Sequence, residues 1–558
     1  MLIRKRGVVS RTYRHISRYR QILGVLMAYG YGDLVDRLDV EQYLEIGSKL
    51  VSRKRAERVE KLSRAERIRI ALEDLGSTFI KLGQILSTRP DVVPPDIVKE
   101  LEKLQDEVPP FPFQEARKAV EEETGKPINE IFTFIDEKPL AAASIGQVHR
   151  ARLLGGEEVI VKVRRPGITG KLEVDLEILL HLAMLAEKHI EEIAIYRPAK
   201  IVEEFSRTLE NEMDYTIEAA YAERFARQFF DNPTVYVPKI ITDFSTERVL
   251  VMEYVQGVKA SEIHLLEDRG LDRRIIAERG ADLLLRQVFD YGFFHADPHP
   301  GNIIILPGNV ICYLDFGMMG TVDRKSRENM ADMAYAIVKR NEEKATDALL
   351  EMVEVDGEPD RRILETDVAT LMEMYVYKSL KEIRIEKILQ QMLDIISKHR
   401  LHLPYDKFLM MKALATMEGL GLRLDPDFDL TRQAAPFIKR IKIKQFSPWR
   451  LMDDFVSTGA DLMRLFRVMP DEIYSILKQA RLGKIRLVLD NTGIIILAQT
   501  LERIGTRISL ALIAGALIIG SYLFISTGKG FSIFGIPILG LAGFILAGFL
   551  AIVMIAKK

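Results

Sequence analysis

Residues 295–317 carry side chains that are suited to phosphoryl transfer. Asp297 and Asn302 lie five residues apart in the run His295-Ala296-Asp297-Pro298-His299-Pro300-Gly301-Asn302, and Asp315 begins the run Asp315-Phe316-Gly317. Phosphoryl transfer needs carboxylate and amide oxygens that hold Mg²⁺ against the phosphates, and often a carboxylate that orients the attacking oxygen. We assign Asn302 and Asp315 as the Mg²⁺ ligands and Asp297 as the base or water-positioning group. The competing explanation is that these residues only form turns. That explanation does not account for the combined occurrence of the Asp297–Asn302 run, a hairpin and the Asp315-Phe316-Gly317 run at matching spacing.

Lys162 is a single charged residue in the apolar run Val159–Val163, which the pattern predicts to be a strand. Burying an ammonium group without a partner is costly, so this lysine needs a carboxylate nearby. The predicted helix over Pro198–Phe229 offers Glu212, Asp214 and Glu218 as partners. Glu212 and Glu218 are six residues apart and point to different faces of one helix. We expect Glu218 to pair with Lys162; a lysine on an edge strand with its head in solvent is the alternative.

Two further segments are candidates for nucleotide contacts. An alanine-rich run precedes the lysine strand, where a kinase has its glycine-rich phosphate loop, and its methyl groups would stiffen the backbone. On its own this run would be read as the start of a helix. A second segment follows an apolar strand, as a kinase hinge does, and its backbone groups would bind adenine. The candidate ATP-binding residues are Pro139, Leu140, Ala141, Ala142, Ala143, Ser144, Ile145, Gly146, Gln147, Lys162, Glu253 and Val255.

The elements that would position these residues follow from periodicity and turn signals. Residues 35–107 are predicted to be helical, with Leu72, Leu75, Phe79, Leu82 and Leu86 at helical spacing. Short strands surround the one long helix over Pro198–Phe229, and helices dominate after Tyr254 except for one hairpin that returns Asp315 toward Asn302. The predicted strands are Ile145–Leu153, Glu157–Arg164, Tyr236–Asp243, Arg248–Tyr254, Ile303–Leu306 and Val310–Leu314.

The composition excludes several classes of protein. The 558 residues include 79 Lys and Arg and 80 Asp and Glu, for a net charge of −1, so we expect no nucleic-acid partner. Cys312 is the one cysteine, which excludes an intrachain disulfide and a cysteine-based zinc site. Seven arginines and lysines precede any acidic residue at the amino end. They would form either a basic surface helix or a segment attracted to anionic lipid.

The carboxyl end has the composition of a membrane segment. Lys529 is the only charged residue between Ile508 and Ala556, and two runs, Ile508–Thr527 and Phe531–Ala556, are each long enough to span a bilayer. We therefore expect a transmembrane helical hairpin with both ends on the cytoplasmic or equivalent side; a buried hydrophobic hairpin is the alternative. Glycines in both runs would permit close helix packing, and this suggests self-association as a homodimer.

Together these residues resemble the UbiB family, the AarF-domain-containing (ADCK-type) atypical kinases of the protein kinase-like superfamily. Three features carry the resemblance: the alanine-rich loop, the run Lys81-Leu82-Gly83-Gln84, which is similar to the family's KxGQ motif, and the run Glu212-Met213-Asp214-Tyr215-Thr216-Ile217-Glu218-Ala219, which is similar to its acidic signature. The resemblance is strong over residues 72–320 and weaker beyond them. Without it, Lys81 and Gln84 would be read as the polar face of an amphipathic helix.

The resemblance implies an α+β fold, a bilobal protein kinase-like fold with an N-terminal helical extension and a C-terminal transmembrane helical hairpin. It implies that the KxGQ extension covers the active site, with Lys81, Gly83 and Gln84 as regulatory residues and Lys81 paired with Glu212. Lys162 would grip the phosphates of ATP, with Mg²⁺ as the second cofactor. The expected divisions are a basic helical region (1–71), the KxGQ extension (72–130), the N-lobe (131–257), the helical C-lobe (258–440), a helical linker (441–507) and two transmembrane helices (508–558).

Members of the family support isoprenoid quinone metabolism at membranes, so the resemblance implies a membrane enzyme that hydrolyses ATP or phosphorylates a small lipid-like molecule. Its partners would be the bilayer and a membrane lipid or an isoprenoid or quinone precursor. A protein kinase acting on membrane-associated partners is the main alternative. Ala296 stands where a protein kinase has its catalytic-loop arginine, and no Ala-Pro-Glu follows Gly317, and both features weaken that alternative. A nucleotide-gated lipid-binding scaffold with negligible turnover is the third reading.

Overall fold

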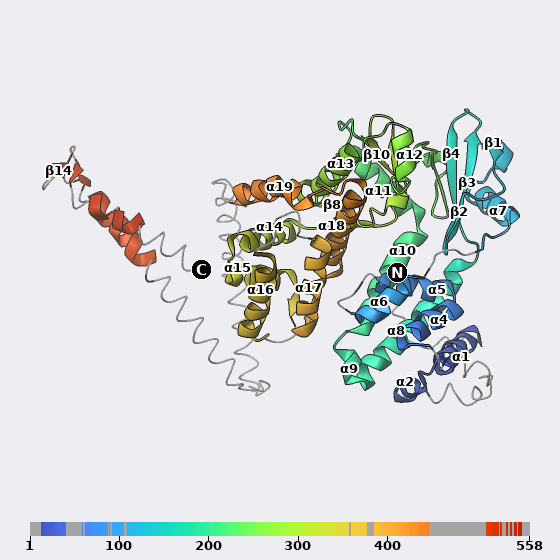
Figure 1. The fold of residues 1–558 in the computed structure, drawn as a ribbon, viewed down its shortest axis with the longest axis horizontal. Coiled ribbons are helices and arrows are strands. Elements are labelled where there is room, and N and C mark those ends of the chain that lie inside the picture. The colour runs from blue at the N-terminus through green and yellow to red at the C-terminus, as the bar shows by residue number, and fades with distance from the viewer. Residues whose placement is uncertain are drawn as a thin grey trace, which may run out of the picture. The chain divides into compact units, whose positions relative to one another are not determined.

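The structure is a computed structural model that divides into two compact units, Met1–Arg450 and Leu451–Lys558 (Figure 1). The residues that it describes are 13–38, 40, 59, 62–87, 89, 92–104, 109–355, 359–376, 384–445, 509, 511–523, 525–526, 532–533, 536–537, 541–543 and 545–548.

The first lobe of the larger unit is built on an antiparallel sheet. Its path is β1-β3-β4-β6, with β2 paired to β3. The strands are β1 (Phe132–Ile135), β2 (Ala141–Ala142), β3 (Gly146–Leu153), β4 (Glu158–Arg164) and β6 (Val249–Glu253). Val159, Val161 and Val163 of β4 are buried on one face, in a core that includes residues of α7 (Phe113–Thr124). Alternation along the strand therefore places Lys162 on the other face. Gly156, with φ 92°, lies in the turn between β3 and β4, where a left-handed backbone suits glycine.

Three helices follow the lysine strand, where the sequence predicts one. They are α8 (Ile168–His189), α10 (Pro198–Met213) and α11 (Tyr215–Gln228), with the short α9 (Glu191–Ala194) between the first two. The predicted single helix over Pro198–Phe229 is wrong, because Asp214 takes an extended conformation (φ −111°, ψ 97°) and caps α11 by accepting a hydrogen bond from the N–H of Thr216. Helix α8 was not predicted; its apolar residues pack toward α10 and the N-terminal helices.

The N-terminal helices form a layer against α8. They are α1 (Tyr13–Ala28), α2 (Gly32–Arg37), α4 (Arg64–Leu75), α5 (Ser77–Ser87) and α6 (Pro95–Leu101). The helical spacing from Leu72 to Leu86 is interrupted at Gly76, whose φ of 95° suits glycine and ends α4. Buried Asp175 of α8 joins three helices, because it accepts hydrogen bonds from Arg18 of α1 and Thr78 of α5. Helix α5, which carries the KxGQ motif, is therefore held at its start.

The second lobe is mainly helical and contains two apolar cores. Its helices are α12 (Ile263–Asp268), α13 (Arg273–Leu285), α14 (Arg324–Lys339), α15 (Glu342–Met352), α16 (Arg361–Val376), α17 (Ile385–Lys398), α18 (Tyr405–Leu424) and α19 (Leu430–Gln445). A small sheet has the order β5-β10-β9-β7. The remaining strands are β5 (Val235–Tyr236), β7 (Val258–Lys259), β8 (Phe293–His295), β9 (Ile303–Leu306), β10 (Val310–Tyr313), β11 (Met319–Thr321), β12 (Glu354–Val355) and β13 (Leu401–His402).

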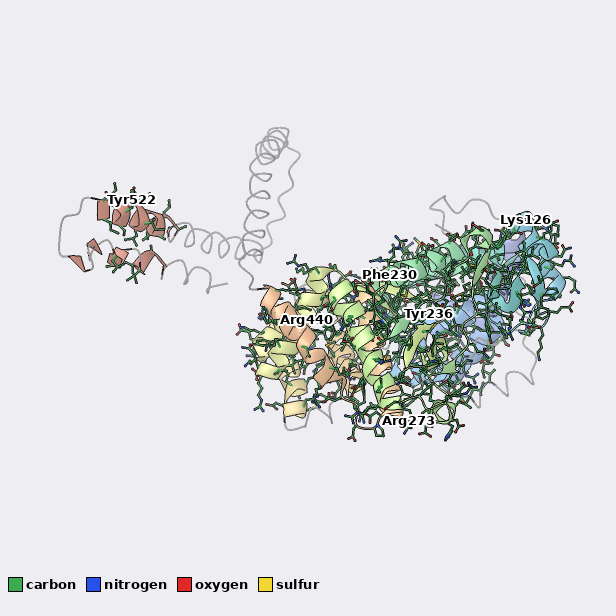
Figure 2. The ribbon with its side chains drawn as sticks, turned by 90° about the horizontal axis from the view of Figure 1, so that it is seen from above. Lys126, Phe230, Tyr236, Arg273, Arg440 and Tyr522 are labelled. Atoms are coloured by element: carbon green, nitrogen blue, oxygen red, sulfur yellow. The ribbon has the colours of Figure 1, made fainter. Side chains whose placement is uncertain are left out.

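The predicted strand Tyr236–Asp243 is mostly wrong. Strand β5 ends at Tyr236, which is labelled in Figure 2, and pairs with β10 of the second lobe. Residues Thr242–Phe244 form a 3₁₀ turn. The apolar residues that suggested one strand are instead divided between two cores. Val237 and Ile240 pack against the core of the helical lobe, and Ile241 packs against the core of the first sheet.

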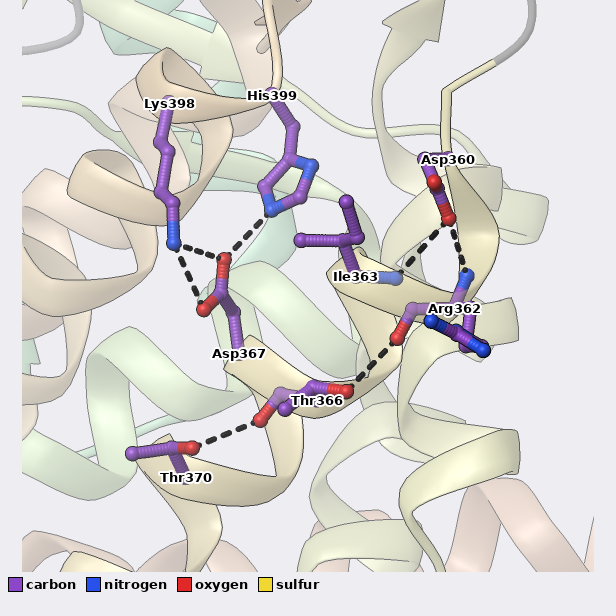
Figure 3. A network of polar contacts seen from close by, with 8 residues as sticks. All are labelled: Asp360, Arg362, Ile363, Thr366, Asp367, Thr370, Lys398 and His399. Carbon is purple, nitrogen blue, oxygen red and sulfur yellow. Dashed lines mark hydrogen bonds and ion pairs between the residues drawn. The ribbon is translucent and has the colours of Figure 1, made fainter.

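A polar network around Asp367 joins α16 to the end of α17 in the helical lobe (Figure 3). Its carboxylate accepts hydrogen bonds from Lys398, at 2.7 and 2.9 Å, and contacts the Nε2 of His399 at 2.7 Å. These bonds lower the pKa of Asp367. The network fixes the end of α17 against α16, far along the chain from the candidate site residues.

The smaller unit contains helical segments at 511–523, 541–543 and 545–548 and the strand pair β14 (Ser532–Ile533) and β15 (Ile536–Pro537). A Cβ on Gly543 would lie 2.1 Å from the Oγ of Ser521, so these two helical segments approach closely, as the glycine content suggested. In the part of the chain that the structure describes, no helix is long and apolar enough to cross a membrane. The predicted spans lie partly, and the predicted linker mostly, outside the described residues, so both stay predictions.

Candidate active site

Lys162 is held between two carboxylates. Strand β4 lies between β3 and β6, so the edge-strand alternative for this lysine is wrong. Its ammonium group forms an ion pair with Glu218 of α11 and lies 3.8 Å from Oδ2 of Asp315. The side chains of Lys162 and Glu218 are 12% and 7% exposed. The expected pairing of Lys162 with Glu218 is therefore present, and it connects the sheet, α11 and the run that begins at Asp315.

Burial and ion pairing act in opposite directions on the three charged groups: burial raises the pKa of Glu218, although the ammonium group of Lys162 opposes that shift. Burial alone would lower the pKa of Lys162, but the carboxylates of Asp315 and Glu218 raise it. The ammonium group of Lys162 in turn lowers the pKa of Asp315, and the N–H of Gly317, 2.8 Å from its Oδ1, adds to the effect. Asp315 is therefore ionised at neutral pH, as a metal-binding carboxylate must be.

His295 connects the Asp297 loop to Asp315. Its Nε2 lies 2.6 Å from the carbonyl oxygen of Asp315, and its Nδ1 accepts a hydrogen bond from the N–H of Asp297 at 3.2 Å. A carbonyl can only accept, so Nε2 carries the proton and the ring is neutral. Burial lowers the pKa of His295, which agrees with the neutral ring. His295 also stacks on Tyr313 of β10, so one buried ring fixes the loop and the returning strand together.

The hairpin of β9 and β10 brings the two candidate metal ligands together. The N–H of Leu314 donates to the carbonyl of Asn302 at 2.9 Å, so Asn302 is adjacent to Asp315 across the hairpin. Asp315 is 49% exposed and Asp297 37% exposed, so both carboxylates can be reached from solvent. Among the described residues no group of three or more His, Cys, Asp or Glu side chains could hold a metal ion by itself. An amide and one carboxylate instead fit Mg²⁺ that takes its other ligands from phosphates and water.

The alanine-rich run forms a tight hairpin and not the start of a helix. Ala141 pairs with Val148 and Ala142 with Gln147, and the N–H of Ala143 donates to the carbonyl of Gly146 at 2.8 Å. Gly146 cannot carry a side chain, because a Cβ there would lie 2.5 Å from Oη of Tyr215 and 2.6 Å from the carbonyl oxygen of Val163. The hairpin is thus pressed against the strand that carries Lys162, in the place expected for a phosphate loop.

Not every residue predicted to contact ATP points to the site. The side chain of Gln147 is buried, and its Oε1 accepts a hydrogen bond from the N–H of Phe111 at 3.1 Å. Ser144 and Ile145, in the turn of the hairpin, are also buried, whereas Leu140, just before β2, is 54% exposed. Among these side chains, that of Gln147 is committed to holding the segment before α7 against β3.

The predicted hinge contributes through its backbone at most. The carboxylate of Glu253 accepts hydrogen bonds from Oη of Tyr236 at 2.6 Å and from the N–H of Lys239 at 3.1 Å. It therefore faces β5 and the segment after it. Val255 is buried with Ile304 and Cys312 in a small apolar cluster between the two lobes.

The KxGQ helix reaches the site through its lysine. The Nζ of Lys81 lies 2.9 Å from Oε1 of Glu212 at the end of α10, which is the pairing that the resemblance implies. The charge of Lys81 also contributes to the lowered pKa of Asp315. Gly83 has a packing role, since a Cβ there would lie 2.3 Å from Cδ1 of Leu104 and 2.9 Å from Cδ1 of Leu72. Gln84 donates to the carbonyl of Leu104 at 3.4 Å and so helps to hold α5 in place.

One residue at the site was missed. Lys412 of α18 lies with its Nζ 3.7 Å from Oδ1 of Asp297. It stands 115 residues after Asp297, so no local spacing connects the two. The available signal was the one that identified Lys162, a lone lysine within an apolar run, here Phe408–Leu414.

Comparisons with known proteins identify the family of this chain. Three family models match the chain: the ABC1 atypical kinase-like domain over 103–349, the UbiB helical domain over 368–429 and the ABC1/UbiB kinase-like C-terminal domain over 492–557. The "Probable protein kinase UbiB" of Pseudomonas fluorescens (strain Pf0-1) is 37% identical over 414 residues, 74% of this chain and 78% of the relative. The protein of the same name from Pseudomonas aeruginosa (strain LESB58) is 35% identical over 464 residues, 82% of this chain and 87% of the relative.

A solved structure, that of Rv3197 from Mycobacterium tuberculosis in complex with erythromycin, matches 66% of this chain and 94% of its own at 25% identity, with a TM-score of 0.46. The kinase-like α+β fold and the identity to the curated relatives over most of the chain place the protein in a family: it belongs to the ABC1/UbiB family of atypical kinase-like proteins.

Proposed function

We propose that this protein is a Mg²⁺- and ATP-dependent phosphotransferase or ATPase that works at a membrane in isoprenoid lipid or ubiquinone-type quinone biosynthesis. The observation that carries the proposal is the placement of the Lys162 ammonium group between Glu218 and Asp315, beside the loop of Asp297 and Asn302. A buried, paired lysine next to amide and carboxylate oxygens is an arrangement that binds a metal-bound triphosphate.

Each residue has a role in this proposal. Lys162 binds phosphate oxygens, and Glu218 keeps its head in place. Asn302 and Asp315 hold Mg²⁺, which when bound neutralises phosphate charge. Asp297 orients the attacking oxygen, and the bond from His295 to its backbone fixes the loop.

Water or a small molecule fits the site better than a polypeptide acceptor. Helix α5 lies close to Asp315, as the Lys81–Glu212 pair and the effect of Lys81 on the pKa of Asp315 indicate. Only residues 318–323 separate Gly317 from α14, and three of them form β11. This leaves no length for an activation segment of the kind that presents a peptide.

The membrane part of the proposal rests on the sequence of the smaller unit. The apolar run from Ile508 to Ala556, interrupted by Lys529 alone, supports membrane insertion, with the catalytic unit on the cytoplasmic or equivalent side. This placement would bring the site near a lipid-soluble acceptor.

A transfer assay tests the proposal. Full-length protein in membranes would be mixed with ATP labelled at the γ-phosphate and with extracted lipids. We expect free labelled phosphate or a labelled lipid, and a loss of at least about a hundredfold in Asp297→Asn and Asp315→Asn. Asp367→Asn is the matched control, because it removes a carboxylate charge in the Asp367 network, away from the site. Turnover that survives in Asp315→Asn, with unchanged Mg²⁺-ATP affinity, would overturn the proposal.

Protein phosphorylation is the second candidate, favoured by the name "Probable protein kinase UbiB" that the similar Pseudomonas proteins carry. The same assay separates the two candidates. Label on polypeptide alone, absent from lipid and from free phosphate, would replace the first proposal with this one.

A further inference from the structure

Among the described residues, the cation that lies near the carboxylate of Asp297 comes from a helix outside the Asp297 loop. Residues 293–302 contain no lysine or arginine, and Nδ1 of His295 within them accepts a hydrogen bond from the N–H of Asp297. Of the other lysines near the site, Lys162 is paired with Glu218 and Lys81 with Glu212. Among the described residues, Lys412 is the cation within ion-pair distance of Asp297, and Asp297 is the carboxylate within that distance of Lys412.

Lys412 is held in this position by a rigid helix. Its neighbours Met410, Ala413 and Leu414 belong to one apolar core of the helical lobe and Met411 to the other. Later on α18, buried Glu418 accepts a hydrogen bond from the N–H of Ile385 at 2.7 Å and so fixes the start of α17. Helix α18 also lies against β11, which pairs with β8 and therefore with His295. The lysine is thus directed at the loop from a packed surface, with its side chain 22% exposed.

A cation next to Asp297 would reduce the repulsion between this carboxylate and a bound triphosphate. Asp297 must lie close to an attacking oxygen beside an anionic triphosphate, and two negative groups repel each other. A neighbouring ammonium group reduces this repulsion and holds the carboxylate in one orientation. A partly exposed ion pair contributes little to the stability of the fold, so stability alone is a weak reason for it.

We propose that Lys412 is a positioning residue for Asp297, supplied to the active site by α18 of the UbiB helical domain. The helical domain then contributes a side chain to the active site, in addition to packing against the kinase-like domain. This inference rests on the proposed phosphoryl-transfer function.

The first test compares three variants of the full-length protein in Mg²⁺-ATP hydrolysis. Lys412→Met removes the charge and keeps the length of the side chain. We expect kcat to fall about ten- to a hundredfold, KM for Mg²⁺-ATP to change by less than about threefold, and Lys412→Arg to keep most of the activity. Lys407→Met is the matched control, because Lys407 lies on the same helix and donates to the carbonyl of Met352. It should leave kcat near the wild-type value.

The second test asks whether Lys412 acts through Asp297. In the Asp297→Asn background, Lys412→Met should cause no further loss, whereas a structural defect would lower activity again by the same factor. The inference is overturned if Lys412→Met retains wild-type kcat while Asp297→Asn is inactive, or if the two losses multiply. A fully active Asp297→Asn would remove the proposed role of Asp297 itself, and with it this inference.

Discussion

Three lysines from three different elements face the carboxylates of the site. Lys162 of β4 contacts Glu218 and Asp315, Lys81 of α5 contacts Glu212, and Lys412 of α18 contacts Asp297. Lysines and carboxylates therefore compensate each other before a nucleotide binds. In the proposed function, Mg²⁺ at Asp315 would compete with Lys162 for this carboxylate. Glu218 would set the strength of that competition, because it pairs with the same ammonium group.

Glu218→Gln tests this competition. Removing one member of a buried pair costs about 3–5 kcal/mol when the other is left alone, but Lys162 keeps Asp315, so we expect a loss of about 1–3 kcal/mol in the free energy of unfolding. Lys162 should turn toward Asp315, and KM for Mg²⁺-ATP should rise about tenfold. Denaturant titration and ATPase kinetics measure the two effects.

Glu223→Gln is the control for that variant. It removes an exposed carboxylate from the same helix, where Glu223 pairs with Arg227, and should change stability by about 0.5 kcal/mol or less. Equal effects of the two variants would contradict a special role for Glu218.

His149 gives a prediction for pH dependence. Oε1 of Gln147 accepts from Phe111, so its NH₂ group donates to Nε2 of His149, and Nδ1 of His149 donates to the carbonyl of Asp136. The ring is thus neutral, and burial lowers its pKa. Below pH about 6.5 the unfolded state takes up a proton that the folded state resists, so this stability is present above pH 6.5 and is lost as the pH falls.

We expect the free energy of unfolding to fall between pH 7.5 and 5.5, with His149 contributing on the order of 1 kcal/mol of the decrease. Urea titrations at both pH values, in wild type and in His149→Asn, measure this. The variant should be less stable at pH 7.5 and should show a smaller decrease, because one group that resists protonation is gone. An identical decrease in both proteins would rule out His149 as a source of the pH dependence.

At the scale of elements, the break between α10 and α11 at Asp214 places Glu212 and Glu218 on two different helices. Because the chain turns there, Glu212 ends α10 and pairs with the KxGQ helix, while Glu218 lies on α11 and pairs with the lysine strand. A single straight helix would have to present both glutamates from different faces. The cap of α11 therefore sets the direction of both ion pairs.

Asp214→Ala should destabilise the protein by about 0.5–2 kcal/mol, because α11 loses a side chain that accepts from the N–H and the Oγ of Thr216. Asp214→Ser, which can still cap the helix, should recover most of this stability. Thermal unfolding followed by circular dichroism measures both variants. A full loss in the serine variant would show that the carboxylate charge, and not the cap, is what matters.

The parts of the site that could be predicted from the sequence are those determined by residues close together in the chain. Lys162 was found because a charge in an apolar strand needs a partner, and the hairpin after Asn302 because its turn residues are distinctive. The break at Asp214 was missed, since an aspartate inside a helical pattern signals a cap only when the chain changes direction there. Helix α8 and Lys412 were also missed. The position of α8 depends on packing against helices far away in the sequence, and the role of Lys412 depends on the approach of α18 to the Asp297 loop.

At the scale of the whole molecule, the chain divides into two compact units. The larger one, Met1–Arg450, has several apolar cores of its own. The family models follow this division, since the kinase-like and helical domains match residues up to 429 and the C-terminal domain begins at 492. The larger unit should therefore fold and bind nucleotide without the smaller one.

A chain that ends at Arg450 tests this independence. We expect it to unfold cooperatively and to bind Mg²⁺-ATP with an affinity within about threefold of the full chain, because all the named site residues lie before Arg450. It should not sediment with neutral phosphatidylcholine vesicles, whereas the full chain should. Neutral lipid is chosen because it offers no charge to the basic residues near the amino end, so retention reports apolar insertion alone. A chain that ends at Thr506 is the control, since it lacks only the apolar runs; its retention on these vesicles would contradict the membrane hairpin.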